Sequence, residues 1–375
     1  MVPFRSYALV SRGQLARNFR AVQDLVGPQV EVLGVVKADA YGHGAAEVSR
    51  LLEAEGARWL AVSSVEEGVA LRRAGRRTSI LVMAGFLRAE REALVEFELT
   101  PAVHSLEDIA ELEQYAQAAG RPLAFHLKVD TGMTRLGTRA AVESISAALA
   151  SLTHARFEGL MTHFASAADY QSLQTEHQVE AFERILAALR QSGHAPALVH
   201  AAGTTALAYG RRESWHNMVR PGHALYGYVS PARGEAPKRV LDVKPVLTWK
   251  AKIIAVKDVP EGTLVGYGGT FRAPRPMRIG VLALGYADGL PHRLSNKGRV
   301  IAGGKPAPIL GTVSMDLTTV DLTQTPALAP GDEVTILGEE GDARLDAQQI
   351  ARLAGTISYN VLCGISPRVH RVYVD

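Results

Sequence analysis

The first 230 residues alternate short apolar runs with stretches of helical periodicity, and few folds produce this pattern. Segments 106–112 and 141–152 carry apolar residues at helical spacing and predict amphipathic helices. Strands that alternate with helices usually pair in parallel, and eight of them predict a (βα)8 barrel rather than an open sheet. The eight apolar runs lie at 31–36, 58–63, 79–84, 100–103, 123–129, 156–162, 196–200 and 217–220.

After about residue 235 the pattern changes, because Gly and Pro become frequent and the apolar runs are no longer separated by helical segments. Only one helix is expected there, at 345–354. This region predicts a mainly β domain. Its expected strands lie at 246–257, 278–284, 299–302 and 332–337. With 230–237 as the linker, the expected domains are 1–235 and 236–375.

Charge and cysteine content exclude several classes of protein. There are 41 basic and 38 acidic residues, a net charge of +3, which is too balanced to indicate nucleic acid or an anionic membrane as a partner. Cys363 is the only cysteine, and the N-terminal residues do not resemble a secretory signal, so a cytoplasmic location is expected. No apolar stretch reaches the ~18 residues needed to span a bilayer. No metal site is expected, since the spacings C-x-x-C and H-E-x-x-H do not occur.

Lys37 follows the apolar run 32–36 and precedes a polar loop, 38–44, that contains a tyrosine, a histidine and two glycines. A lysine at the exit of a buried strand has a partly desolvated amine, which lowers its pKa and suits a Schiff base with an aldehyde cofactor. Taken alone, the residue is more often a strand-end lysine whose amine reaches water.

Polar side chains also follow other expected strands, at the end where barrels place their catalytic groups. The last two strand ends suggest a phosphate site, with the Thr204 hydroxyl and the backbone N–H groups of Gly222 and His223 before a helical segment. Glycine-flanked tyrosines of the β domain, such as Tyr267, are commonly turn or packing residues. With an ordinary pKa of about 10 they are poor bases near neutrality. The strand-end residues are Lys37, Lys128, His163, His200 and Arg220.

Together these segments resemble the alanine racemase family, in which a (βα)8 barrel that binds pyridoxal phosphate (PLP) is joined to a C-terminal β domain. The resemblance extends from about residue 8 to residue 372. It rests on V-V-K-A-D-A-Y-G-H-G at 35–44, K-V-D-T-G-M-T-R-L-G at 128–137, N-M-V-R-P-G at 217–222, G-Y-G at 266–268, G-Y-A-D-G at 285–289 and S-M-D at 314–316.

The resemblance implies a role for each residue of the site. Lys37 would carry PLP covalently, and Arg220, linked to His163 beside the ring, would face the pyridine nitrogen. Because arginine keeps its proton, that nitrogen would stay unprotonated and side reactions would be limited. The phosphate would be held by Tyr41, Thr204, Gly222, His223 and Tyr359. The substrate carboxylate would be held by Arg135 and the backbone of Met315, with Lys128 often carbamylated beside Arg135.

The resemblance also implies a two-base reaction. Lys37 and Tyr267 would lie on opposite faces of the substrate, each within reach of the α-proton. Tyr267 would come from the partner subunit of a head-to-tail homodimer. The expected activity is interconversion of L- and D-alanine, supplying D-alanine for peptidoglycan.

The sequence departs from the family pattern in three places. Gly203-Thr204 stands where Asn-Ser is frequent, Ser314 where cysteine is frequent, and Gly364 where arginine is usual. Neither proposed base is affected. The departure at Gly203 removes an amide side chain, and the departure at Gly364 puts one interdomain or interface contact in question.

Three other functions stay open. A broad-specificity amino-acid racemase would share the same motifs. A PLP-dependent decarboxylase would need an acidic cysteine, for which Cys363 in an apolar run is the only candidate. A non-catalytic PLP-binding barrel protein is disfavoured by the second domain.

Overall fold

The computed structural model describes residues 4–375 and divides into two compact units. The β unit comprises the described residues up to Gln14, residues 41–44 and residues 245–375. The barrel unit comprises residues 15–40 and 45–244. The domain boundary expected between residues 235 and 236 stays a prediction.

The barrel unit is built on eight parallel strands, which confirms the expected (βα)8 fold. Their order is β8-β7-β6-β5-β4-β3-β2-β9, and a parallel bridge between Gly203 and Arg220, which follow β8 and β9, brings the two edges together. The sheet is therefore nearly closed, and strand ends far apart in sequence converge on one rim. The strands are β2 (Glu31–Val35), β3 (Trp59–Val62), β4 (Ser79–Val82), β5 (Thr100–Val103), β6 (Leu123–Lys128), β7 (Ala155–Met161), β8 (Leu198–His200) and β9 (Met218–Val219).

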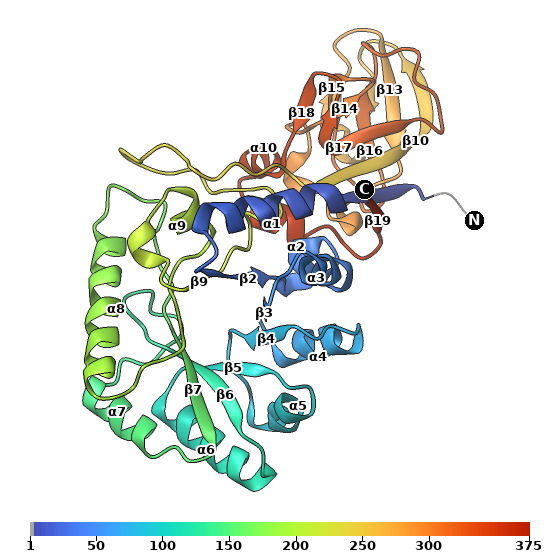
Figure 1. Ribbon diagram of the computed structural model, residues 1–375. Coiled ribbons are helices and arrows are strands. Elements are labelled where there is room, and N and C mark those ends of the chain that lie inside the picture. The colour runs from blue at the N-terminus through green and yellow to red at the C-terminus, as the bar shows by residue number, and fades with distance from the viewer. Residues whose placement is uncertain (1–3) are drawn as a thin grey trace. The chain divides into compact units, whose positions relative to one another are not determined.

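Helices alternate with these strands, and Figure 1 shows α4, α5 and α8 on the outer side of the sheet. α6 shows how the sequence defines such a helix. The Ser105 side chain accepts from the N–H of Asp108 at its start, and Gly120 ends it with a φ of 62°. The helices expected at 106–112 and 141–152 are confirmed as α6 and α7. The helices are α1 (Arg12–Val26), α3 (Ala45–Ala54), α4 (Val65–Arg73), α5 (Arg91–Glu96), α6 (Leu106–Ala119), α7 (Val142–Ala150), α8 (Gln174–Gln191) and α9 (Thr204–Ala208).

The segment α2 (Lys37–Gly42) is helical, but its handedness is reversed. The φ angles are 52° at Ala38, 52° at Asp39, 54° at Ala40 and 54° at Tyr41. Left-handed backbone costs roughly 1–2 kcal/mol for each residue that has a Cβ. Neighbouring groups hold this turn, since Glu67 accepts from Ala38 N–H at 2.7 Å and Asp39 from Ala45 N–H at 2.7 Å. The sequence predicts only a polar loop here.

The β unit contains a nine-stranded sheet with the central order β15-β14-β17-β10-β1-β19, while β13 joins β10 to β16 and β18 pairs with β17. β1 (Ser6–Ser11) belongs to this sheet, running antiparallel to β10 and parallel to β19. The other strands are β10 (Leu247–Val259), β11 (Leu264–Val265), β12 (Phe271–Arg272), β13 (Met277–Leu282), β14 (Arg299–Ala302), β15 (Lys305–Pro308), β16 (Thr318–Asp321), β17 (Glu333–Glu340), β18 (Ala343–Leu345) and β19 (His370–Val374).

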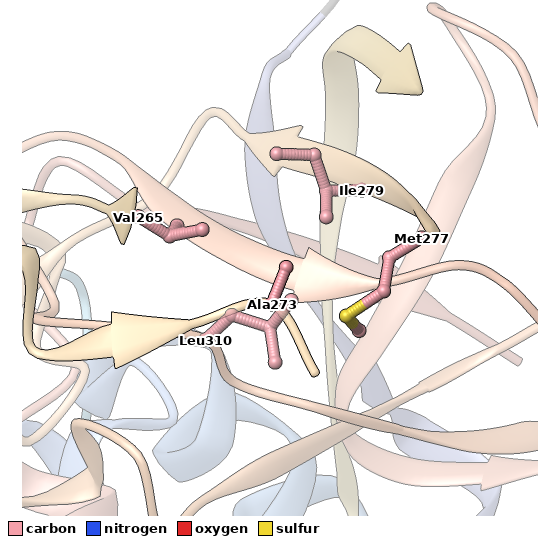
Figure 2. Packing of buried hydrophobic residues seen from close by; sticks show 5 residues of the cluster. All are labelled: Val265, Ala273, Met277, Ile279 and Leu310. Carbon is pink, nitrogen blue, oxygen red and sulfur yellow. The ribbon is translucent and has the colours of Figure 1, made fainter. Parts of the chain in front are cut away.

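A small apolar cluster supports the hairpin β11–β12 of this unit, and Figure 2 shows five of its buried side chains. They are Val265, Ala273, Met277, Ile279 and Leu310. The hairpin carries the glycine-flanked tyrosine at its turn, so the cluster fixes the base from which that tyrosine projects.

The expectation of a single helix in this region was wrong. α10 (Ala347–Ala354) is followed after a short turn by α11 (Ser358–Cys363), whose six residues are too few for a clear apolar period. Among residues 4–375, no helix combines the length and the apolar character that crossing a membrane requires.

Candidate active site

Arg220 is the centre of the polar network in the barrel unit. It follows β9 directly and is 4% exposed. Its Nη1 donates to His200 Nδ1 at 2.8 Å and to the His200 carbonyl at 2.7 Å. Its Nη2 donates to the carbonyls of Thr162 (2.7 Å) and Ala201 (2.9 Å) and to His163 Nδ1 at 3.2 Å. Burial lowers the pKa of Arg220 to about 10, so the group stays cationic near neutrality.

The contacts of Arg220 determine the protonation of two histidines. A guanidinium can only donate, so Nδ1 of His163 and Nδ1 of His200 must both accept, and each neutral ring carries its proton on Nε2. Burial, and then the charge of Arg220, lowers the pKa of His163 to about 3 and that of His200 well below its ordinary value. The structure therefore brings three predicted strand-end residues together as one cation between two neutral imidazoles.

His126 extends this network and was not singled out from the sequence. It is fully buried in β6, and its Nδ1 lies 2.8 Å from His200 Nε2. A signal was available, because His126 precedes Lys128 by two residues in one strand, which places both side chains on the same face. Position at a strand end does not predict His126, because this histidine lies inside an apolar run.

Lys128 ends β6 and is 5% exposed. Burial, then the positive charges of Arg220 and Arg135, lowers the pKa of its amine to about 8. Lys37 also contributes to this effect and lies half-buried two residues after the end of β2. Four basic residues thus meet at one rim, which makes it attractive to anions.

The proposed phosphate residues of the barrel unit contact one another. Thr204 begins α9, and its Oγ1 accepts from the N–H groups of Gly222 (3.1 Å) and Ala224 (3.2 Å). The Thr204 hydroxyl proton remains as a donor. The His223 ring is buried and stacks on Tyr228 with centroids 5.2 Å apart. The helical segment expected after Gly222 was wrong, since turns occupy 223–227.

In the β unit, Tyr41 and Tyr359 place their rings 6.0 Å apart. Tyr41 is 8% exposed, and burial, followed by Tyr359, raises its pKa above the ordinary value. Arg371 Nε donates to the Gly42 carbonyl at 2.9 Å, which ties the loop 41–44 to the C-terminal strand. Two of the proposed phosphate residues therefore lie close together, Tyr41 on this tied loop and Tyr359 in α11.

Tyr267 and Met315 are exposed on the β unit, at 75% and 53%. Tyr267 lies between Gly266 (φ 74°) and Gly268 (φ 71°), and its carbonyl accepts from Thr312 Oγ1 at 3.2 Å. The carbonyl of Met315 accepts from the N–H of Ala287 at 3.0 Å. Backbone contacts therefore fix both turns, while the two side chains project into solvent.

Comparison with known proteins gives consistent results over both units. The family model described as "Alanine racemase, N-terminal domain" matches residues 10–231, and "Alanine racemase, C-terminal domain" matches residues 246–373. The chain is 40% identical over 370 residues to alanine racemase of Halothermothrix orenii, covering 98% of this chain and 96% of that protein.

Two solved structures show the same fold. Alanine racemase of Clostridium difficile 630 has 32% sequence identity and a TM-score of 0.93, covering 100% of this chain and 97% of that one. Alanine racemase of Bartonella henselae with covalently bound pyridoxal phosphate has 27% identity and a TM-score of 0.88, covering 99% of this chain and 100% of that one.

Proposed function

This chain belongs to the alanine racemase family and is an isomerase, and we propose that it interconverts L- and D-alanine with PLP as its cofactor. The observation that carries the proposal is the Arg220 network. All five of its hydrogen bonds use the Nη atoms, and none of the described residues accepts from Nε–H. One directed donor is therefore left for the unprotonated nitrogen of a pyridine ring.

Other residues of the chain supply the groups that the rest of this cofactor needs. Lys37 would hold it covalently, since the amine follows a barrel strand and shares the cationic rim with Lys128. Thr204 and Gly222, already in contact, would hold its phosphate with His223, Tyr41 and Tyr359. When bound, PLP withdraws electrons from the α-carbon of the amino acid and so makes its proton acidic.

We propose that two bases move that proton. The Lys37 amine would serve one face of the α-carbon and the Tyr267 phenol the other. Tyr267 would come from the partner subunit of a homodimer. Supporting this, its side chain is 75% exposed and a base needs a polar site closed to water to act efficiently. A second copy of the chain would provide that enclosure.

The substrate carboxylate would bind Arg135 and the backbone of Met315. We further propose that Lys128 is carbamylated. Its pKa of about 8 leaves more neutral amine, the form that reacts with carbon dioxide, than an ordinary lysine has. The resulting anion would pair with Arg135 and orient it.

The proposed biological role is supply of D-alanine for peptidoglycan, in the cytoplasm. The single cysteine, Cys363, supports that location because proteins of reducing compartments rarely depend on disulfides.

The test is an assay of the purified protein with PLP and a panel of L-amino acids, following the loss of optical activity. We expect alanine to be racemised fastest. Lys37→Ala should lose both the cofactor absorbance and the activity, whereas exposed Lys238→Ala should keep both. Racemisation by Lys37→Ala would refute the assignment. Equal rates on bulky amino acids would favour a broad-specificity racemase, and carbon dioxide release from basic ones a decarboxylase.

A further inference from the structure

Four side chains form a continuous line through the barrel unit, from Arg220 to Glu158. Arg220 Nη1 lies 2.8 Å from His200 Nδ1, and His200 Nε2 lies 2.8 Å from His126 Nδ1. Beyond them, His126 Nε2 lies 3.7 Å from Glu158 Oε2, an electrostatic contact longer than a hydrogen bond. The four groups come from the ends or interiors of β9, β8, β6 and β7, so the barrel itself assembles the line.

The hydrogen bonds along this line all point in one direction. Arg220 only donates, so His200 accepts at Nδ1 and donates from Nε2, and His126 must accept at Nδ1 and carry its proton on Nε2. That proton faces the carboxylate of Glu158, whose negative charge favours the same direction. Each N–H group therefore points away from the cation and toward the anion, an arrangement in which neighbouring hydrogen bonds strengthen one another.

The backbone holds the His126 ring in place. A Cβ at Gly159 would lie 2.6 Å from His126 Cγ, so only glycine leaves room for the ring at that position. The centroid of the Trp59 ring lies 5.2 Å from the centroid of the His126 ring. The pairing of β6 with β7 shifts register at this point, which leaves Glu158 as the extra residue beside the ring. These contacts therefore fix the His126 ring, and with it the position of the Nδ1 lone pair.

We propose that His126 is a positioning residue for racemisation: its Nδ1 accepts the His200 Nε2 proton and thereby keeps His200 Nδ1 aligned with Arg220. Without that acceptor, His200 holds a buried N–H group with no partner, which costs about 1–3 kcal/mol. The ring then turns toward another acceptor, and Nη1 of Arg220 loses its partner. The kinetic part of this proposal rests on the proposed function, in which Arg220 faces the cofactor.

The first measurement uses the cofactor-free protein and does not depend on activity. In ¹⁵N-histidine-labelled wild type, we expect His200 Nε2 to carry an exchange-protected proton coupled across the hydrogen bond to His126 Nδ1. A His200 ring protonated on Nδ1, or no such coupling, would overturn the proposal, and no variant has to fold for this result.

The second measurement compares two amides at position 126. In His126→Asn the side-chain oxygen falls close to the position of Nδ1, whereas in His126→Gln it reaches toward Nε2 and misses His200. Asn should keep the protected proton and near-normal turnover. Gln should lose the proton and lower kcat about tenfold or more, with KM for alanine almost unchanged, because a misplaced group far from the reacting atoms has effects of this order.

His216→Gln is the matched control. His216 is another largely buried imidazole of the barrel unit, packed on Phe182 and outside the line. It should leave the His200 signal and kcat unchanged. If kcat of His126→Gln equals or exceeds that of His126→Asn, the volume of the side chain matters rather than its acceptor atom, and the proposal fails. If wild type shows the His200 signal but no racemisation, the proposed function fails while the hydrogen-bonded line stands.

Discussion

The central residues of the Arg220 network in the barrel unit and two site residues of the β unit, Tyr267 and Met315, differ in exposure. In the barrel unit, Arg220 and His200 are 4% and 0% exposed, and their hydrogen bonds are provided within the same chain. In the β unit, Tyr267 and Met315 are 75% and 53% exposed, and only their backbones are held. A fixed charge can be buried in advance if its hydrogen bonds are satisfied, whereas a group that must meet substrate from another direction stays outside until it is covered.

The tyrosines show why this division matters. Tyr41 is buried, and its environment raises the phenol pKa, so even less of it is present as the phenolate near neutrality than for an ordinary tyrosine. Tyr267, in contrast, lies on an exposed turn. Under the proposed homodimer, the cationic rim of the partner subunit would cover it.

Tyr267→Phe should produce the largest effect, and only on activity. Removing a general base lowers turnover by roughly 10²–10⁴-fold. The ring is exposed, so stability should change by no more than about 0.5 kcal/mol. Solvent-deuterium exchange into L-alanine measures the first effect and urea denaturation the second. Undiminished exchange would remove Tyr267 from the mechanism.

Arg220→Lys should affect stability as well as activity. An ammonium group cannot reproduce the planar fork, so at least two of the five acceptors lose their donor. At about 1–3 kcal/mol for each unpaired group, we expect a loss of about 3 kcal/mol in the cofactor-free protein. Urea denaturation gives the value. The control is Arg139→Lys on the surface, where the ion pair with Asp130 is 60% exposed on the arginine side and the change should be small.

Lys128→Met should stabilise the cofactor-free protein in buffer freed of carbon dioxide. The folded-state pKa is about 8, below the unfolded value of about 10.4. Between these values the unfolded chain binds more protons, so wild-type stability should rise as pH increases from about 8 to about 10.4. The variant should lack that rise and be more stable at pH 7 by about 2–3 kcal/mol.

Exposed Lys238→Met is the control for this measurement and should keep the wild-type pH dependence. A wild-type protein whose stability is flat over this pH range would show that the amine is not desolvated. Added bicarbonate should stabilise wild type but not Lys128→Met if the amine is carbamylated.

Mixing Lys37→Ala with Tyr267→Phe gives the smallest effect but the most direct test of a shared site. If subunits exchange freely, half of the dimers are hybrids, and one of the two sites in each hybrid lacks both lesions, so activity should recover to about one quarter of wild type. Each variant alone is the control. A mixture as inactive as its components would mean that each chain builds its own site.

Much of this architecture could be predicted because it depends on local periodicity. The eight apolar runs became β2 to β9, and the polar residues after them converge because parallel strands share one rim. The reversed handedness of α2 could not be predicted, since Ala38, Asp39, Ala40 and Tyr41 do not favour positive φ and the turn depends on acceptors supplied by other segments. The membership of β1 in the C-terminal sheet likewise depends on pairing with strands more than 200 residues away.

The sequence by itself determined which chemical groups are available and at which strand ends they stand, because strand period and length are properties of short segments. Only the tertiary structure decided their protonation and exposure. Arg220, His200 and His126 stand apart in the chain, with the two histidines 74 residues from each other, and only barrel closure brings their nitrogens within hydrogen-bonding distance. Charge and tautomer depend on burial and on neighbours, and both arise from contacts that no short segment contains.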